Sequence, residues 1–250
     1  MNLDDGRTIF VKSHDDPPAG MFAAEARGLG QIAGVAGLGV PEVLAVGERW
    51  LALEWISPGR GDTASWEALG RGLAALHLRQ CPTFGAPEDG FIATLPQDNT
   101  PADTWPDFYG RRRIIPMAEL AIERGGLDPG CRADVQALCE RLAELCGPAE
   151  SPSRLHGDLW SGNAMMDETG RPWLIDPAAY GGHREMDLAM MALFGGFPAA
   201  CFAAYDEVHP RAPGHAGRVD LCQLYPLLVH AALFGGGYGR RAQRIIRSYL

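Results

Sequence analysis

Three polar side chains in the second half of the sequence have the spacing of a phosphoryl-transfer site. Asp158 precedes Asn163 by five positions, and Asp176 follows Asn163 by thirteen, at the end of the apolar run Trp173–Ile175. In a kinase catalytic loop, an aspartate accepts the proton of the acceptor hydroxyl, while an asparagine and a second aspartate bind magnesium. Because hard Mg²⁺ prefers such oxygen ligands, the spacing predicts Asp158 as the catalytic residue and Asn163 and Asp176 as metal ligands. ATP and Mg²⁺ are the cofactors that this arrangement requires.

Each of the three residues also has a structural interpretation. Asp158 fits a turn in a Gly-Asp loop, Asn163 fits a left-handed position, and Asp176 before a proline fits a turn cap. Their joint spacing favours the catalytic interpretation, because short strands are predicted where the motif requires them. These strands cover residues 154–158, 164–166 and 173–175. We expect His156 to orient the loop through a backbone hydrogen bond.

Phosphoryl transfer also needs a cation on the nucleotide phosphates, and the sequence offers one candidate. Lys12 is the only lysine among 22 basic residues, and it ends the β-rich run Thr8–Lys12. In the helix predicted after the next two prolines, Glu25 lies on an apolar face with Phe22 and Leu29. A carboxylate there needs a cationic partner, so the sequence predicts a Lys12–Glu25 pair that binds the phosphates. The alternative is a surface lysine and a partly exposed glutamate.

The strands that follow in the sequence supply a candidate for adenine binding. One strand is predicted over residues 41–46 and a stronger one from Trp50 to Ile56. At the end of the second strand, Glu54, Trp55 and Ile56 stand where we expect a hinge that offers backbone groups to adenine. This assignment depends on the order of the elements alone, and a buried strand end is an equally good interpretation.

Composition and charge exclude several classes of protein. With 250 residues, 46% of them hydrophobic, the chain can bury a full core in one domain or in two packed lobes. A net charge of −9 argues against nucleic-acid or anionic-membrane partners, which require a basic surface. The six cysteines form no CxxC pair and indicate reduced thiols. The charged N-terminus and the lack of a long apolar run predict a cytoplasmic protein.

The order of the predicted elements indicates an α+β fold with two lobes. Strands concentrate in residues 1–56, the predicted N-lobe, whereas residues 57–250, the predicted C-lobe, are mostly helical. Residues 83–106 are rich in Pro, Gly, Asp and Thr and are predicted to form a long loop on the larger lobe. Helices are predicted near residues 66–76, over residues 114–124, 129–146, 184–194, 198–208 and 218–233, and at the C-terminus.

Four further features have structural interpretations. Asp187 is predicted to cap the helix that begins at Arg184, because a carboxylate there suits the helix dipole. His77 continues an apolar stripe and is predicted to be a core histidine with satisfied hydrogen bonds. The segments 194–197 (FGGF) and 234–238 (FGGGY) do not join a strand to a helix as a phosphate loop must, so we predict that they are helix ends.

Together, these motifs resemble one family, the fructosamine kinases, also called ketosamine-3-kinases. The segment Asp158–Asn163 (DLWSGN) is far more specific than the Asp-to-Asn spacing that aminoglycoside and choline kinases share. The resemblance extends over nearly the whole chain and implies a two-lobed protein-kinase-like fold. It runs through residues 9–12 (IFVK), 21–25, 53–54, 73–77, 95–99 (LPQDN), 156–163 (HGDLWSGN), 176–178 (DPA), 182–185 (GHRE), 194–198 (FGGFP) and 224–225.

The resemblance implies ATP-dependent phosphorylation of the 3-hydroxyl of a ketosamine, which is a sugar attached to an amine. Such an ester is unstable and releases the amine, so the expected activity is the repair of glycated lysines, with a small-molecule or protein-bound ketosamine as the partner. Trp160 then lies beside the base, where its ring packs against the sugar or, equally, anchors the core. Carried onto this chain, the resemblance makes Asp158 the proton acceptor and Asn163 and Asp176 the magnesium ligands. It also implies that Lys12 and Glu25 position the nucleotide phosphates and that Glu54 to Ile56 form the hinge.

One part of the family pattern is missing from this sequence. Family members carry a strand, a glycine-containing phosphate loop and a second strand ahead of the lysine strand, and only 11 residues precede Lys12 here. We therefore expect an N-lobe that is incomplete at its start, with an exposed sheet edge that favours self-association. Two alternatives follow: a kinase for another hydroxylated amine, such as an aminoglycoside or choline, or a nucleotide-binding protein with impaired catalysis. Trp160 and the segment 97–99 favour the ketosamine.

Overall fold

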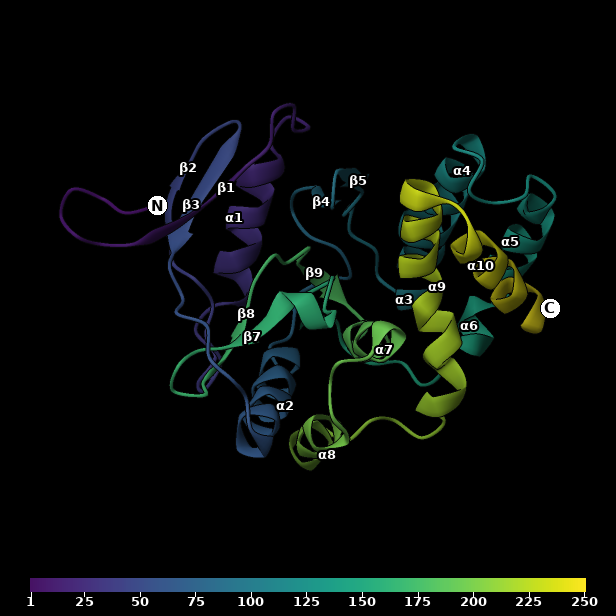
Figure 1. Ribbon diagram of the computed structural model, residues 1–250. Coiled ribbons are helices and arrows are strands. Elements are labelled where there is room, and N and C mark those ends of the chain that lie inside the picture. Colours follow the sequence, from purple (N-terminus) through teal and green to yellow (C-terminus); the bar gives the residue numbers. More distant parts are fainter.

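The N-terminal part of the chain forms a three-stranded antiparallel sheet that packs against one helix (Figure 1). In the computed structural model, which describes residues 1–250, β1 (Ile9–Ser13) pairs with β3 (Trp50–Glu54), and β3 pairs with β2 (Val43–Val46). α1 (Met21–Ile32) buries Phe22 against this sheet in a small apolar cluster. The predicted strands and helix of this region are confirmed, with bounds shifted by a few residues.

β1 is an edge strand of this sheet. Its inner neighbour is β3, with Lys12 opposite Leu51. On the outer side, Met1 and Ile9 exchange two backbone hydrogen bonds, of 2.8 and 2.9 Å. Beyond that point no strand pairs with the outer side of β1, and Phe10 and Val11 are exposed. Self-association through this edge stays a prediction.

Helices dominate the rest of the chain (Figure 1). α2 (Thr63–His77) begins at a capping box in which the Asp62 carboxylate accepts from the Ser65 N–H at 2.8 Å, and it packs along α8 (Ala199–Val208). The other helices are α3 (Trp105–Phe108), α4 (Ile115–Glu123), α5 (Cys131–Glu140), α6 (Leu142–Leu145), α7 (Glu185–Phe194), α9 (His215–Phe234) and α10 (Gly237–Ser248), with a π-helical segment at Tyr109–Ile114. Of these, α9 lies against α4, α7 and α10.

A segment after α1 joins the small sheet to the larger part. Ile32, Val35 and Leu38 are buried in the same apolar cluster as residues of α2 and α8. Gly39 also exchanges backbone hydrogen bonds with the segment 172–174, of 2.7 and 2.9 Å. The two parts therefore share a core across residues 32–40, and the lobe division after residue 56 stays a prediction.

Two pairs of short antiparallel strands fix the predicted catalytic segments. β6 (Ser153–Leu155) pairs with β9 (Tyr180–Gly182), and β7 (Ala164–Met166) pairs with β8 (Pro172–Leu174). The register sets the last residue of β6 opposite the first of β9, and the first residue of β7 opposite the last of β8. The loop from β6 to β7 and the loop from β8 to β9 are therefore held side by side at both ends.

Three elements differ from the sequence-based expectations. The predicted loop over residues 83–106 contains a hairpin, β4 (Gly90–Ile92) and β5 (Leu95–Gln97), whose three-residue strands are too short to show an alternating pattern. β9 is missed for the same reason. The single helix predicted over residues 129–146 is divided into α5 and α6 at Arg141, whose guanidinium binds the Tyr249 carbonyl in a tertiary contact that no local pattern shows. No helix is long and apolar enough to span a membrane.

The contact between α2 and α8 gives a test of this packing. A methyl group on Gly70 would lie 2.1 Å from the Cys201 backbone oxygen, so we expect Gly70→Ala to lower the free energy of unfolding by about 1–3 kcal/mol or more. The matched control is Gly30→Ala in α1, where nothing lies within 4 Å of the added methyl. It should raise the free energy of unfolding by about 0.5–1 kcal/mol. Urea denaturation measures both, and equal effects would contradict the close α2–α8 contact.

Candidate active site

The loop between β6 and β7 carries Asp158 and is fixed by the ring of His156. The His156 Nε2 donates to the Ile175 carbonyl at 2.9 Å, and its Nδ1 accepts from the Asp158 N–H at 3.3 Å. The ring is buried, and burial lowers its pKa, so it holds this loop as a neutral group. His156 thus orients the loop through a backbone hydrogen bond, as the sequence analysis expects.

Asp187, at the start of α7, holds the same loop through the backbone. Its Oδ2 accepts from the His156 N–H at 2.7 Å and its Oδ1 from the Gly157 N–H at 2.9 Å, while Oδ2 also contacts His77 Nε2 at 3.1 Å. Burial would raise the pKa of Asp187, but the hydrogen bond and charge of His77 outweigh it and lower the pKa. The expectation of a helix cap is wrong, because the carboxylate turns away from its own helix and into the loop.

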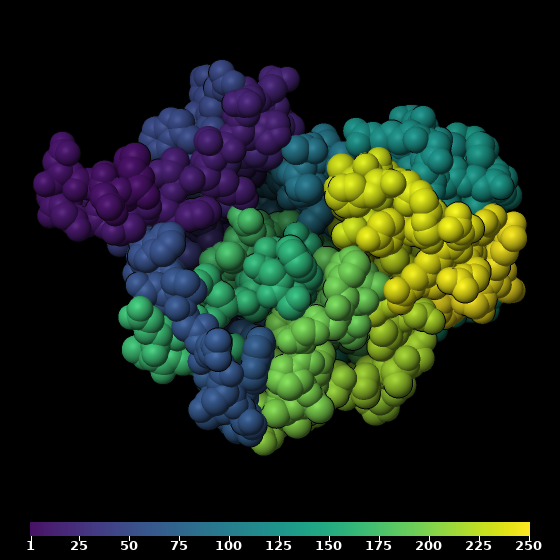
Figure 2. Space-filling view, viewed as in Figure 1, coloured from purple at the N-terminus to yellow at the C-terminus, as the bar shows by residue number.

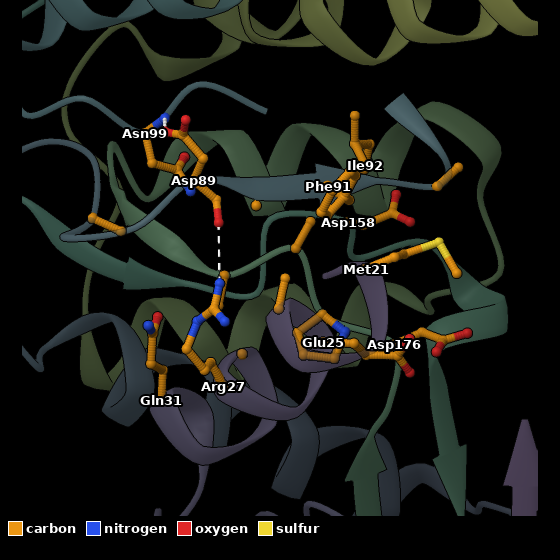
Figure 3. Close-up of a pocket in the computed structure, with 18 of the residues that line it drawn as sticks. Met21, Glu25, Arg27, Gln31, Asp89, Phe91, Ile92, Asn99, Asp158 and Asp176 are labelled. Atoms are coloured by element: carbon orange, nitrogen blue, oxygen red, sulfur yellow. Dashed lines mark hydrogen bonds between the residues drawn. The ribbon is translucent and has the colours of Figure 1, made fainter. Parts of the chain in front are cut away.

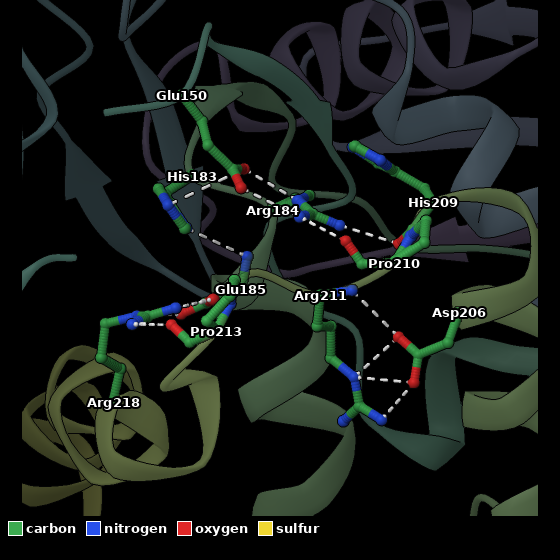
Figure 4. A network of polar contacts seen from close by, with 10 residues as sticks. All are labelled: Glu150, His183, Arg184, Glu185, Asp206, His209, Pro210, Arg211, Pro213 and Arg218. Atoms are coloured by element: carbon green, nitrogen blue, oxygen red, sulfur yellow. Dashed lines mark hydrogen bonds and ion pairs between the residues drawn. The ribbon is translucent and has the colours of Figure 1, made fainter. Parts of the chain in front are cut away.

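Two features around Asp187 complete its support. His77 bonds the Tyr205 hydroxyl at 2.9 Å as well as Asp187, so it is a satisfied core histidine, as predicted. The segment before Asp187 is held by one partly buried and one buried ion pair (Figure 4). Arg184 binds both oxygens of Glu150, at 2.8 and 2.9 Å. Arg218 of α9 binds both oxygens of Glu185, at 2.6 and 2.8 Å. These pairs fix the start of α7 and hence the carboxylate of Asp187.

Asn163 and Asp176 converge on Asp158, although they come from different loops. The Asn163 Nδ2 donates to the Asp158 carbonyl at 2.8 Å and to Asp158 Oδ2 at 3.3 Å. The Ile175 N–H donates to the Asn163 carbonyl at 3.0 Å, which brings Asp176 next to the catalytic loop. Asp176 has φ of 53°, in the left-handed region that a non-glycine residue seldom adopts. Strain of this kind is concentrated at functional sites.

Lys12 links the small sheet to this group of acids. Its Nζ lies 2.9 Å from Glu25 Oε2 and also binds Asp176 Oδ1. Burial would lower the pKa of Lys12, but the charges of Asp176 and Glu25 raise it. Burial and the neighbouring Asp176 raise the pKa of Glu25 to about 7. The predicted Lys12–Glu25 contact is present, and Asp176 is a third member that the sequence spacing did not connect to it.

The Asp158 carboxyl is the second acid whose pKa is raised. Burial, with the negative charges of Asp176 and Asp187, raises the pKa of Asp158 to about 7. The hydrogen bond from Asn163 and the charge of Lys12 act in the opposite direction but do not outweigh these effects. A carboxyl group with such a pKa can accept a proton near neutral pH.

These residues line one cavity of about 420 Å³ (Figure 3). Its catalytic wall is formed by Lys12, Glu25, Asp158, Asn163, Asp176 and Trp160. Besides Glu25, α1 contributes Arg27 and Gln31 to the lining, next to the β4–β5 hairpin, and the two elements are joined where the Arg27 guanidinium donates to the Asp89 carbonyl at 3.2 Å. Trp160 is 42% exposed and lines this cavity, so it is not part of the buried core.

The predicted hinge residues lie outside this cavity. Glu54 ends β3, Trp55 and Ile56 follow it, and none of the three lines the cavity. The Glu54 N–H donates to the Glu42 carbonyl at 2.9 Å, and the Glu54 carboxylate accepts from the Glu42 N–H at 3.2 Å. The structure therefore brings together six of the nine residues named from the sequence and leaves these three apart.

A second, smaller cavity also has Asp158 in its wall. It is lined by Asp158 together with Tyr180, Met186, Tyr225, His230 and others of α7 and α9. Tyr180, Met186 and His230 are not singled out by the sequence motifs, because they come from elements far apart in the chain. Leu224-Tyr225 in the family resemblance is the one signal that could have found part of this wall.

A buried arginine supports both cavities from behind. Arg113 is fully buried, with its guanidinium 4.2 Å from the centre of the Tyr180 ring. It donates to the Asp98 carbonyl at 2.5 Å and to Asn99 Oδ1 at 2.6 Å, and Gln97 Nε2 donates to the Tyr225 hydroxyl at 3.1 Å. The segment 97–99 is thus fixed to the aromatic wall of the smaller cavity.

The raised pKa of Asp158 predicts how stability depends on pH. Because its folded-state pKa of about 7 exceeds the ordinary 3.8, the folded chain keeps this proton where the unfolded chain loses it, and stability falls as the pH rises from about 4 to about 7. Asparagine cannot ionise. In the absence of metal, we expect Asp158→Asn to be more stable than the parent at pH 8 by more than about 1 kcal/mol, with the difference vanishing near pH 4.

Urea denaturation at several pH values measures this difference. Asp15→Asn, at an exposed position, should change stability by less than about 0.5 kcal/mol at every pH. Equal stabilities of Asp158→Asn and the parent at pH 8 would show that the site solvates its carboxylate.

Comparisons with known proteins agree on one family. A family model described as fructosamine kinase matches residues 1–250. A "Probable ketoamine kinase" of Thermus thermophilus is 42% identical, over 93% of this chain and 84% of that protein. A second one, from Synechocystis sp., is 39% identical over 99% of this chain and 85% of that protein. The chloroplastic protein-ribulosamine 3-kinase of Arabidopsis thaliana is 35% identical over 98% and 77%.

Solved structures support the same relationship. One assigned as a fructosamine-3-kinase from Thermobifida fusca has a TM-score of 0.92 and 44% identity, covering 99% of this chain and 87% of that one. A macrolide 2'-phosphotransferase from Brachybacterium faecium, at 19% identity and a TM-score of 0.63 over 98% and 86%, has the same fold. The predicted α+β, two-lobed protein-kinase-like fold is thereby confirmed. This chain is a member of the fructosamine kinase family, whose members are kinases that phosphorylate an alcohol group.

Proposed function

We propose that this chain transfers the terminal phosphate of ATP to the 3-hydroxyl of a ketosamine. Its relatives are named ketoamine kinases and protein-ribulosamine 3-kinases. The observation that carries the proposal is the convergence of Lys12, Asp158, Asn163 and Asp176 on one cavity. A cation, a base and two hard oxygen ligands are the protein groups that phosphoryl transfer from ATP requires.

The oxygen atoms at the catalytic wall fit a Mg²⁺ ion. Asn163 forms its side-chain hydrogen bonds through Nδ2, so its Oδ1 has no protein donor. Asp176 binds Lys12 through Oδ1, so its Oδ2 is also without a protein donor. No group of three or more His, Cys, Asp or Glu side chains could hold a metal alone, and the other ligands would be nucleotide phosphates and water. Bound there, Mg²⁺ would neutralise charge on the transferred phosphate.

Asp158 acts as the base in this proposal. Its carboxylate accepts the proton of the acceptor hydroxyl as the oxygen attacks the terminal phosphate. The backbone of Asp158 is held on both sides, by the His156 ring at its N–H and by the Asn163 amide at its carbonyl. The carboxylate is therefore preorganised, which spares the entropy of orienting it during the reaction.

Lys12 and the hinge would hold the nucleotide. Lys12 Nζ lies between Glu25 and Asp176, where it can bind phosphate oxygens while its position is fixed. The register of β1 and β3 sets Lys12 opposite Leu51, three residues before Glu54, which is about 10 Å along a strand. An extended nucleotide with its phosphates at Lys12 would reach toward this strand end, and this supports Glu54 to Ile56 as the hinge.

The acceptor sugar would lie between the two cavities that meet at Asp158. Trp160, exposed beside the base, offers an aromatic face to a sugar ring. The smaller cavity adds the hydroxyl groups of Tyr180 and Tyr225 and the imidazole of His230. A mixed aromatic and polar wall suits a molecule with apolar C–H faces and several hydroxyl groups.

The experiment that tests this function offers ATP, with and without Mg²⁺, together with ribulosyl-lysine or fructosyl-lysine. We expect Mg²⁺-dependent transfer to the 3-hydroxyl, located by phosphorus NMR, and a fall in kcat of about 10²- to 10⁴-fold in Asp158→Asn. Asp206→Asn is the matched control, because Asp206 lies on α8 and accepts from Arg211, away from the loop that carries Asp158. Turnover of an aminoglycoside or choline without turnover of a ketosamine would refute the proposal.

The support that Asp187 gives to the catalytic loop predicts a second loss of activity. In Asp187→Asn the amide group faces a backbone N–H in place of an oxygen, so the loop shifts. We expect kcat to fall by about 100-fold, the cost of a displacement near 1 Å, while the KM for ATP changes by less than about threefold. Initial rates, normalised by the folded fraction from circular dichroism, measure this effect. An unchanged kcat would show that the loop keeps its position without Asp187.

A further inference from the structure

Two phenylalanines, each at the end of a helix, have exposed side chains. α7 ends at Phe194, which is 42% exposed, and α9 ends at Phe234, which is 69% exposed. Glycines with positive φ follow each of them and turn the chain sharply away. The predicted helix ends are thus confirmed, and each one leaves a phenylalanine ring at the surface.

The two helix ends meet at one imidazole. The ring of His230 lies 4.9 Å from that of Phe194, 5.6 Å from Phe234 and 5.0 Å from Tyr238, measured between ring centres. His230 is fixed in turn, because its Nδ1 donates to the Pro226 carbonyl at 2.8 Å. Phe194, His230, Phe234 and Tyr238 therefore form one aromatic surface, which we call the rim cluster.

The rim cluster is continuous with the active site. His230 lines the smaller cavity together with Asp158. The turn after α7 also touches the catalytic loop, because a methyl group on Gly196 would lie 2.5 Å from Ser161 Cβ. Ser161 follows Trp160, the other exposed ring at this site. In Figure 2 the C-terminal helices, in yellow, lie beside the green segments of the catalytic region.

This continuity limits where the rest of a substrate can go. With the sugar hydroxyl at Asp158, the amine and whatever carries it must leave past the walls of the cavity. His230 connects the two, because it lines the cavity and packs against the other rings of the rim cluster. Those rings would contact the carrier and not the sugar. Exposed aromatic rings next to a binding cavity mark a surface that binds apolar groups.

We propose that the rim cluster docks the polypeptide that carries the ketosamine, through apolar side chains beside the modified lysine. The inference rests on the proposed function and adds to it a surface that contacts the polypeptide around the modified lysine. The partner is an extended or unfolded segment, because only such a segment presents both the modified lysine and an adjacent apolar side chain to one rim. The rim cluster adds affinity for the carrier and takes no part in phosphate transfer.

The test compares three substrates that carry the same ribulosyl-lysine. The first is the blocked single amino acid, the second a nine-residue peptide with leucine and phenylalanine beside the modified lysine, and the third the same peptide with glycine and serine there. We expect the apolar peptide to have a KM at least tenfold below that of the other two. Phe234→Ser should abolish this advantage and leave the KM of the single amino acid within twofold. Leu78→Ser, at another exposed apolar position after α2, should keep it.

Several results would overturn the proposal. Equal KM values for the three substrates would show that the rim does not bind the carrier. An equal rise in KM for all three in Phe234→Ser would place Phe234 at the sugar. A change from dimer to monomer in Phe234→Ser, measured by light scattering, would show that a second copy covers the rim cluster.

A direct binding measurement separates this proposal from the proposed function. The labelled apolar peptide with an unmodified lysine is titrated with the protein and followed by fluorescence anisotropy. Docking requires binding that Phe234→Ser weakens at least tenfold, whether or not any ketosamine is phosphorylated. Turnover of the single amino acid with no binding of this peptide would refute the docking surface alone, and binding without any turnover would refute only the proposed function.

Discussion

The buried carboxylate of Asp187 is the contact on which the catalytic region depends. It accepts hydrogen bonds from two backbone N–H groups of the loop that carries Asp158, and it contacts His77 as well. These three contacts compensate the negative charge of a carboxylate that is almost completely buried. The loop is thereby held by its backbone, which leaves its side chains available for ligands. The ion pairs of Arg184 and Arg218 hold the start of α7, and so the position of Asp187 is set by contacts with residues from several parts of the chain.

The electrostatics of the site follow from this arrangement. Three carboxyl groups, Glu25, Asp158 and Asp176, lie near one ammonium group, that of Lys12. Burial raises the pKa of Glu25 and of Asp158. Burial would also raise the pKa of Asp176, but Glu25 and the charge of Lys12 outweigh it and lower that pKa. In a chain with a net charge of −9, such a site repels bare phosphate groups. The proposed reaction therefore requires that the nucleotide arrives with a cation, which Asn163 and Asp176 would then share.

Much of the fold could be predicted from the sequence because the signals are local. Apolar residues at helical spacing indicated α1, α2 and the helices of the C-terminal half, and glycine pairs indicated the ends of α7 and α9. Elements without a local signal were missed. The three-residue strands β4, β5 and β9 are held by tertiary packing, and the break between α5 and α6 lies where Arg141 binds the last turn of the chain. The hairpin β4–β5 matters most, since it supplies one wall of the larger cavity.

The sequence by itself determined which chemical groups are available for the proposed reaction. The spacing of Asp158, Asn163 and Asp176 and the single lysine are properties of a linear chain, because the groups that bind phosphate and metal are few in kind. The tertiary structure alone decided the pKa values of these groups and the residues that surround them. The raised pKa of Asp158, the link from Lys12 to Asp176, the support from Asp187 and the rim cluster all join residues far apart in sequence. Burial and charge–charge contacts act through space, so no local pattern can encode them.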